Sequence, residues 1–145
     1  MKIYFDTNVL VAASIADHPH HAQSGSAVTA VHSGRIEGFI SSHALAEFYS
    51  VVTRAPFTPR VYPNQAWSLL EGNILPYFQV VALSAKEYQE IIRDCAQQGW
   101  SGGRVYDALH LRCAQKSSCA RIYTLNVRHF QQLAPEIADK ITSPV

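Results

Sequence analysis

Three acidic residues stand where a charged side chain is uncommon and where it could serve chemistry. Asp6, Glu47 and Asp107 each lie at the boundary of an expected helix or strand and have apolar neighbours. Because burying a charge is costly, each of them needs a partner or a function. If two of these carboxylates lie about 5 Å apart, they repel by roughly 3 kcal/mol at an effective dielectric constant of about 20. Such a pair should raise at least one carboxyl pKa or bind a cation.

Each acid also has a structural interpretation that requires no chemistry. Asp6 could cap the start of a helix. Asp107 lies in the first turn of an expected helix, where a negative charge contributes roughly 0.3–1 kcal/mol to stability. Glu47 could be a solvated residue at the edge of an amphipathic helix. Taken singly, these explanations suffice. Together, a strand end, an early-helix position and a helix N-terminus of one α/β chain favour a shared site.

The expected order of elements places Asp6 at the carboxyl end of a strand. β-Forming residues at 2–5 stop at Asp6, and the apolar stretch 9–13 belongs to the first helix. In open parallel α/β sheets, the carboxyl ends of the strands face the crevice where ligands bind. Asp6 is therefore the first catalytic candidate.

The remaining elements alternate between strands and helices. Further strands are expected at residues 39–40, 77–83 and 121–125, with an edge strand from Lys140. Helices are expected at residues 20–32, from 42 to the prolines that begin at 56, and at 64–73, 85–98, 104–116 and 127–133. This alternation predicts the α/β class with a central, mainly parallel sheet of four to five strands.

Single residues add local predictions. Asp17, Ser42 and Ser84 are expected to cap the helices that follow them. Residues 77–83 are apolar enough for a strand buried on both faces, and Trp67 is a candidate packing residue. His110 lies three residues after Asp107, and we expect an ordinary histidine at the boundary of the core.

The composition limits the classes of function. The 145 residues fit one domain spanning 1–145, and 48% hydrophobic against 16% charged residues is typical of a globular protein. A formal net charge of +1 excludes a strongly basic coat for nucleic acid. No apolar run is long enough to cross a membrane and no secretory signal is recognisable, so we expect a cytoplasmic protein. The three cysteines contain no CxxC pair and predict neither a disulfide framework nor a zinc site.

Four segments, in order along the chain, resemble the motifs of one family. They are Asp6 to Leu10 (DTNVL), the Ser42 to Phe48 helix with its Glu47, Tyr106 to Leu111 (YDALHL) and Tyr123 to Asn126 (YTLN). Together they resemble the PIN domain, and most closely the toxin halves of VapBC-type toxin–antitoxin pairs. The resemblance implies a three-layer α/β/α sandwich and a ribonuclease whose acids hold one or two Mg²⁺ or Mn²⁺ ions.

The resemblance also implies residue roles and partners. Asp6, Glu47 and Asp107 fall on the family's first three acidic positions, as catalytic residues and metal ligands, with Glu47 binding directly or through water. A fourth acid often follows the last strand, where this chain has Asn126, so the number of metal ions stays open. The implied substrate is structured RNA, either tRNA or rRNA. The implied partners are an antitoxin and a second copy of the chain, which would associate through the helices near residues 42–73.

Supporting roles fall to neighbouring polar residues. Thr7 and Thr124 could hydrogen-bond a carboxylate or a phosphate, and Asn126 could hold a metal-bound water. Three arginines near the expected mouth of the site could contact phosphates, although plain solvation would also explain them. They are Arg104, Arg112 and Arg128.

Two alternatives remain open at the level of the sequence. The chain could be a PIN-type nuclease of RNA processing that has no antitoxin. It could also be a catalytically idle RNA-binding module, which the missing fourth acid at Asn126 would favour. Assaying RNA cleavage with Mn²⁺ against Asp107→Asn separates an enzyme from a binding module.

Overall fold

Five parallel strands form the centre of the protein in the order β3-β2-β1-β4-β5. The computed structural model describes all residues from 1 to 145. The strands are β1 (Lys2–Phe5), β2 (Glu37–Ser41), β3 (Gln79–Val81), β4 (Arg121–Tyr123) and β5 (Ile141–Thr142). The predicted α/β class is confirmed, and the chain beyond Lys140 adds the expected edge strand.

Strand β1 lies in the middle of the sheet because both of its faces are apolar. Ile3 and Phe5 belong to one buried cluster, whereas Tyr4 belongs to a second cluster on the other face. Side chains alternate across a strand, so one short segment anchors both cores. All three are at most 2% exposed.

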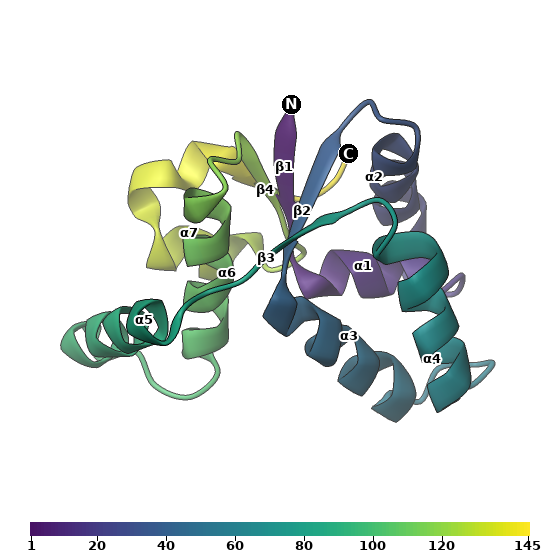
Figure 1. Cartoon of the computed structure of the whole chain (residues 1–145), viewed down its shortest axis with the longest axis horizontal. Helices are drawn as coiled ribbons and strands as arrows, with labels where there is room; N and C mark the ends of the chain where they lie inside the picture. Colours follow the sequence, from purple (N-terminus) through teal and green to yellow (C-terminus); the bar gives the residue numbers. More distant parts are fainter.

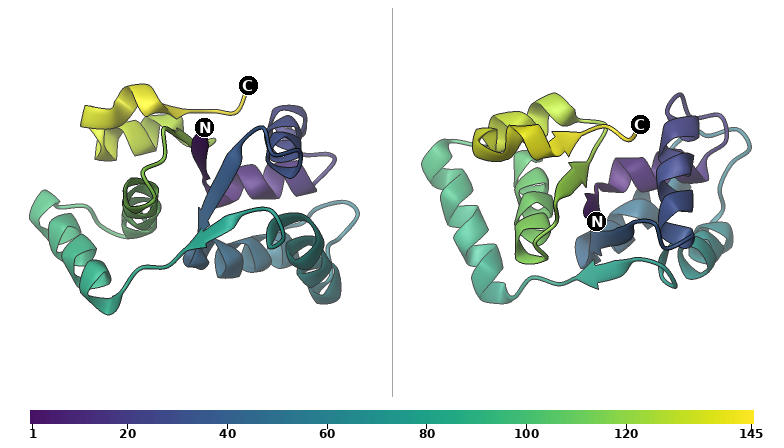
Figure 2. Two further views of the ribbon diagram at one scale, coloured as in Figure 1. Left: turned by 45° about the horizontal axis from the view of Figure 1, so that its top comes forward. Right: turned by 90° about the horizontal axis from the view of Figure 1, so that it is seen from above.

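Helices cover both faces of the sheet and complete three layers. Their bounds are α1 (Thr7–Ser14), α2 (His21–His32), α3 (Ser42–Arg54), α4 (Pro63–Leu69), α5 (Ala85–Gln98), α6 (Arg104–Lys116) and α7 (Val127–Leu133). A π-helical segment, η1 (Leu70–Ile74), continues α4, and a 3₁₀ segment, η2 (Pro135–Lys140), follows α7. Helices α1 to α4 pack on one face, α6 and α7 pack on the other, and α5 lies outside α6 (Figures 1 and 2).

The three central strands direct their carboxyl ends to one edge of the sheet. Asp6 follows β1, α3 begins directly after β2, and Thr124 follows β4. Asp6 N donates to the Tyr123 carbonyl over 2.9 Å, which continues the pairing of β1 with β4 up to the acid. The polar residues of three segments distant in sequence therefore meet at this edge.

Two sequence predictions are wrong in the segment from α4 to β3. Residues 77–83 do not form a strand buried on both faces, because β3 has only three residues and is an edge strand with no buried residue. Trp67 does not pack in the core and is 52% exposed. Ala66 and Leu70 occupy the inward face of this helical stretch instead.

Two of the three predictions of helix caps are also wrong. Ser41, not Ser42, caps α3 by accepting a hydrogen bond from Ala44 N, because β2 extends through Ser41. Asp17 caps nothing, since backbone turns delay the start of α2 to His21. Ser84 caps α5 as predicted, in a reciprocal pair of hydrogen bonds with Glu87. No helix in the structure combines the length and apolarity that crossing a membrane requires.

Candidate active site

Asp6 is a buried carboxylate at the carboxyl end of β1. It occupies the N-cap position of α1, but its side chain makes no capping hydrogen bond, so the capping interpretation is wrong. Asp6 Oδ2 accepts a hydrogen bond from Thr124 Oγ1 over 2.7 Å, and Asp6 Oδ1 lies 3.4 Å from His110 Nε2. Only 5% of the residue is exposed. The side chain therefore points into a polar cluster and away from its own helix start.

Polar residues after β4 support this carboxylate. Thr124 is fully buried and in turn accepts a hydrogen bond from Asn126 N over 3.0 Å. Leu125 N donates to Asn8 Oδ1 over 3.2 Å, which ties the segment after β4 to α1. Thr7 Oγ1 is buried and has no hydrogen-bond partner. Asn126 is exposed and lines the same cavity as Asp6.

Glu47 approaches the cluster from α3, one turn beyond His43. Its Oε1 lies 3.2 Å from His110 Nε2, and its Oε2 lies 3.6 Å from His43 Nε2. The solvated-edge interpretation of Glu47 is wrong, because the carboxylate faces the cavity that Asp6 also lines. Helix α3 carries Ala44, Phe48 and Val52 on its buried face, and this packing orients Glu47 toward the end of β1.

His110 is the centre of the cluster, and the sequence prediction for it was wrong. It is 1% exposed, not a residue at the core boundary. Its Nε2 contacts both carboxylates, and its Nδ1 is hydrogen-bonded to Tyr4 Oη over 2.6 Å. Its spacing from Asp107 allowed a place near the site, because residues three apart share one face of a helix, but the interpretation as a boundary histidine was preferred. The sequence did not indicate a role for Tyr4, since an aromatic residue in a central strand is typical of a core residue.

Asp107 lies in the first turn of α6 and lines the same cavity, which has a volume of about 300 Å³. Asp6, Glu47 and Asp107 are thus brought to one pocket from three separate elements. The tightest group differs from the predicted trio, however. Ligand atoms of Asp6, Glu47 and His110 lie within 4.8 Å of one another.

The electrostatics of the pocket follow from burial and from mutual charge. Burial raises the pKa of Asp6, an effect that His110 and the hydrogen bond from Thr124 only partly offset. Burial and then the charge of Asp6 raise the pKa of Asp107 to about 6. The expected repulsion between close carboxylates is therefore present.

The pKa values of Glu47 and His110 shift in opposite directions, as in an ion pair. Burial would raise the pKa of Glu47, but the hydrogen bond of His110, the nearby Thr7 hydroxyl and the charges of His110 and His43 bring that pKa to about 2. Burial would lower the pKa of His110, but the hydrogen bond to Glu47 and the nearby carboxylates raise it. The imidazole consequently supplies positive charge between two acids.

The three arginines predicted to contact phosphate lie in different surroundings. Arg104 is exposed and lines a neighbouring cavity together with Asp107 and His129. Arg128 is exposed in the first turn of α7. Arg112 points elsewhere, because its Nη1 pairs with Glu90 Oε1 over 3.2 Å between α6 and α5.

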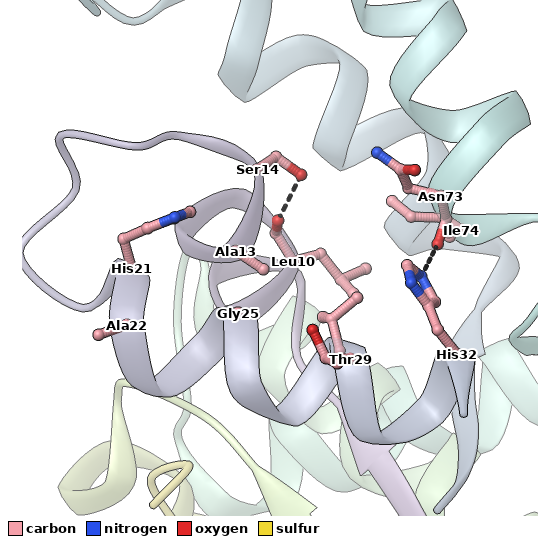
Figure 3. A pocket seen from close by; sticks show the side chains of 11 residues that line it. Leu10, Ala13, Ser14, His21, Ala22, Gly25, Thr29, His32, Asn73 and Ile74 are labelled. Atoms are coloured by element: carbon pink, nitrogen blue, oxygen red, sulfur yellow. Dashed lines mark hydrogen bonds between the residues drawn. The ribbon is translucent and has the colours of Figure 1, made fainter. Parts of the chain in front are cut away.

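A second cavity, of about 400 Å³, lies between α1, α2 and η1 (Figure 3). It contains two histidines but no acid, and His32 Nε2 is already hydrogen-bonded to the Asn73 carbonyl over 2.8 Å. This cavity lacks a group suited to hydrolysis, so the acidic pocket is the candidate active site.

The donor set of the acidic pocket fits a hard divalent cation. Mg²⁺ and Mn²⁺ prefer carboxylate oxygens, and Asp6, Glu47 and Asp107 offer three carboxylates to one cavity. Thr7 Oγ1 adds a buried oxygen without a partner. The structure thus defines a class: a parallel α/β protein with an acidic pocket, suited to a divalent cation, at the carboxyl ends of its central strands.

The comparisons identify the family within this class. The family model of the PIN domain matches residues 3–135, and the chain belongs to the PIN-domain family. Among curated proteins, it is 38% identical over 104 residues to Ribonuclease VapC27 of Mycobacterium tuberculosis, covering 72% of this chain and 70% of that protein. The resemblance seen in the sequence motifs is confirmed.

Solved structures share the fold at low sequence identity. Mycobacterium tuberculosis VapC20, described as a sarcin-ricin loop cleaving toxin, aligns with a TM-score of 0.71 at 15% identity, covering 91% of this chain and 95% of that one. VapBC2 from Rickettsia felis, crystallised with a DNA fragment from its promoter, aligns with a TM-score of 0.68 at 22% identity, covering 100% of both chains. These likenesses confirm the three-layer α/β fold.

Proposed function

We propose that the protein is a metal-dependent endoribonuclease, the toxin of a type II toxin–antitoxin pair, and that it hydrolyses phosphodiester bonds in structured RNA. The observation that carries this proposal is the meeting of Asp6, Glu47 and Asp107 in one cavity of a PIN domain. The ribonuclease name of VapC27 supports the same activity. A tRNA or rRNA substrate and a cytoplasmic location are parts of the proposal.

Asp6, Glu47 and Asp107 would hold Mg²⁺ or Mn²⁺, with Glu47 binding directly or through a water. When bound, such a cation supplies an activated water at neutral pH and stabilises charge on phosphoryl oxygens. The chain's own groups divide the remaining work. Glu47, with its pKa of about 2, stays ionised and orients water. Asp107, whose pKa burial and the charge of Asp6 raise to about 6 in the metal-free pocket, would gain a counter-charge when the cation binds.

The metal is tested by thermal unfolding. A cation that binds only the folded state at about 100 times its Kd adds about 2.7 kcal/mol to the free energy of unfolding. We expect Mn²⁺ to raise the Tm of the wild type, whereas Asp6→Asn should stay folded and lose most of this increase. The exposed Asp17→Asn variant is the matched control. If Mn²⁺ raises the Tm of Asp6→Asn as much as that of the wild type, the proposed metal site is wrong.

The activity is tested by incubating structured RNA with Mn²⁺. We expect cleavage by the wild type and by Asp17→Asn, and none by Asp107→Asn. Attack by water should leave a 5′-phosphate and should not require the ribose 2′-hydroxyl at the cut. A 2′,3′-cyclic phosphate product would exclude this mechanism.

An antitoxin is the expected protein partner. The solved VapBC2 structure, bound to DNA of its own promoter, supports such a pairing. The partner should place an apolar helix in a groove and a basic side chain near the carboxylates. Co-expression with a small DNA-binding protein encoded beside this chain, followed by co-purification, tests this part of the proposal.

A homodimer through residues 42–73 is also proposed. Tyr49, Tyr62 and Trp67 are 41%, 53% and 52% exposed on or beside α3 and α4, a density of exposed aromatic side chains that favours an interface. Light scattering on the wild type and on Trp67→Ala measures the mass of each. A wild type that is monomeric at all concentrations would refute this interface.

Asn126 favours a second candidate function, an idle RNA-binding module, because a fourth acid is absent at that position. Binding of RNA without any cleavage by the wild type in Mn²⁺ would support the module. Cleavage that Asp107→Asn abolishes would support the nuclease. A nuclease without an encoded antitoxin would point to RNA processing.

A further inference from the structure

Two aromatic rings form a parallel stack beside the acidic pocket. The rings of His43 and Tyr106 have centroids 5.0 Å apart and planes 4° apart. His43 comes from α3 and Tyr106 from α6, so the contact joins the two helices that carry Glu47 and Asp107. The stack is therefore held by the same elements as the acids.

The stack is linked to the acids through His43. His43 Nε2 lies 3.6 Å from Glu47 Oε2, one helical turn away, and the ring of His43 also meets His110 edge to face at 6.1 Å between centroids. Tyr106 precedes Asp107 in the first turn of α6. Through His43 the stack adjoins the Glu47 carboxylate, so a ligand on the Tyr106 ring would bind beside the acidic pocket.

The Tyr106 end of the stack is accessible. Tyr106 remains 48% exposed although its ring is stacked on that of His43, so much of the side chain stays available to a ligand. The His43 side chain is 27% exposed and contacts Glu47. A flat ring that is already oriented loses little freedom when a third ring joins the stack.

We propose that the Tyr106 ring, backed by His43, is a stacking platform for an unpaired nucleobase of the RNA next to the bond that is cut. This inference rests on the proposed ribonuclease function and specifies its substrate. A base inside a duplex has both faces covered by its neighbours, so only a single-stranded or flipped-out base can join the platform. What this adds to the proposed function is a contact to one unpaired base, made by the Tyr106 ring.

The chain contains a matched control for this platform. Tyr77 is 45% exposed and lies against His32, with ring centroids 4.1 Å apart and planes tilted by 35°. His32 lines the cavity between α1 and α2, which contains no acid. Removal of the Tyr77 ring therefore imitates the loss of an exposed tyrosine beside a histidine without touching the acidic pocket.

The test measures binding in the Asp6→Asn background, in which no cleavage is expected. Fluorescence anisotropy gives the Kd of a labelled oligoadenylate of about six nucleotides and of the matching abasic ribose-phosphate oligomer. We expect Tyr106→Ala to raise the Kd for oligoadenylate about tenfold and to leave the Kd for the abasic oligomer unchanged. Tyr106→Phe and Tyr106→Trp should retain binding, and Tyr77→Ala should resemble the parent.

Two results would overturn the inference. One is an oligoadenylate Kd that Tyr106→Ala leaves unchanged, and the other is an equal loss for the abasic oligomer, because neither is compatible with stacking on a base. In the cleaving protein, Tyr106→Ala should raise KM and largely preserve kcat. Absence of cleavage by the wild type would refute the proposed function, whereas the anisotropy comparison would still decide whether the ring binds a base.

Discussion

At the scale of single residues, His110 explains how the buried carboxylate of Asp6 and the partly buried carboxylate of Glu47 can lie close together. Its Nε2 contacts Asp6 at 3.4 Å and Glu47 at 3.2 Å, while Tyr4 Oη holds its other ring nitrogen. A protonated imidazole placed between two acids supplies the charge that a metal ion would otherwise supply. The histidine thus stabilises the pocket in the absence of metal.

The effect of His110→Ala follows from this arrangement. The substitution leaves the buried Asp6 and the partly buried Glu47 without their counter-charge, and removal of one partner from a buried ion pair costs about 3–5 kcal/mol. We expect a loss of this size in the free energy of unfolding measured by urea in EDTA. Mn²⁺ should raise the Tm of the variant by more than that of the wild type. A loss below that of Tyr4→Phe, which removes one buried hydrogen bond worth about 1–3 kcal/mol, would contradict the central role of His110.

Asp107 predicts a pH dependence of stability in the metal-free protein. Its pKa rises from 3.8 to about 6 on folding, so its contribution to stability is fully present below pH 3.8 and is lost as the pH rises through about 6. We expect Asp107→Asn to gain stability relative to the wild type between these two pH values, as measured by urea unfolding in EDTA. The gain should level off above pH 6.

Glu47→Gln provides a control of opposite sign. The pKa of Glu47 falls from 4.5 to about 2, so this acid contributes stability above pH 4.5 that is lost as the pH falls through about 2. The Gln variant should therefore be less stable than the wild type at neutral pH and should approach it in acid. If both variants respond to pH in the same direction, the assigned electrostatics are wrong.

The sequence identified the acids more readily than the groups around them. Asp6, Glu47 and Asp107 could be singled out because a charge among apolar neighbours is costly. The spacing of His110 from Asp107 only allowed a place near the site, and Tyr4 gave no signal, because their roles depend on which side chains face each other across β1 and α6. A histidine at the core boundary and one buried among carboxylates have the same sequence environment until those contacts are known.

At the scale of elements, Gly38 shows how closely the first core packs against the sheet. A Cβ at this position in β2 would lie 2.6 Å from two ring atoms of Phe78 and 2.9 Å from Val31 Cγ2. The Phe78 ring in turn meets Phe5 edge to face at 5.1 Å between centroids. The Phe78 ring is buried in the same cluster as Phe5 and Val31, so a shift of this ring would disturb the packing of the core.

Gly38→Ala should therefore destabilise the protein through overpacking. We expect a loss of about 1–3 kcal/mol, measured by urea unfolding. Gly72→Ala is the matched control, since a Cβ there meets no atom within 4 Å. Alanine at position 72 should leave stability equal to or about 0.5–1 kcal/mol above that of the wild type. Equal losses in the two variants would show that the close approach at Gly38 is unimportant.

Element boundaries were predictable where local chemistry sets them. The bounds of α6 and α7 agree with the sequence, and Ser84 with Gly99 encloses α5 as expected. The prediction of a buried strand at residues 77–83 was wrong because an apolar run does not reveal whether a strand lies in the middle or at the edge of a sheet. That position depends on the order of all five strands, which no local pattern contains.

At the scale of the whole molecule, β1 joins the two cores. Ile3 and Phe5 pack against helices α1 to α4, and Tyr4 packs with α6 and α7 on the opposite face. That residues 1–145 fold as one domain stays a prediction, and this sharing of β1 supports it. We expect near- and far-ultraviolet circular dichroism to report the same urea midpoint. Two separated transitions would show that the cores unfold independently.

The overall charge makes a prediction about RNA binding. The net charge is only +1, and the active-site cavity is acidic, so few phosphates can be contacted by basic side chains. Each phosphate contact to single-stranded RNA contributes about 0.7 to the slope of log K against log salt concentration. Arg104 and Arg128 are exposed near Asp107 and Asn126, whereas Arg112 is paired with Glu90.

Replacing either exposed arginine with alanine should therefore reduce the magnitude of the salt slope by about 0.7, and replacing both by about 1.4. Binding of a labelled RNA loop at a series of NaCl concentrations measures these slopes. Arg112→Ala should leave the slope unchanged, because its guanidinium is engaged by Glu90. The exposed Arg93 of α5 serves as the control for loss of charge alone. If Arg93→Ala lowers the slope as much as Arg104→Ala does, RNA is attracted by diffuse charge and not by contacts at the mouth of the acidic pocket.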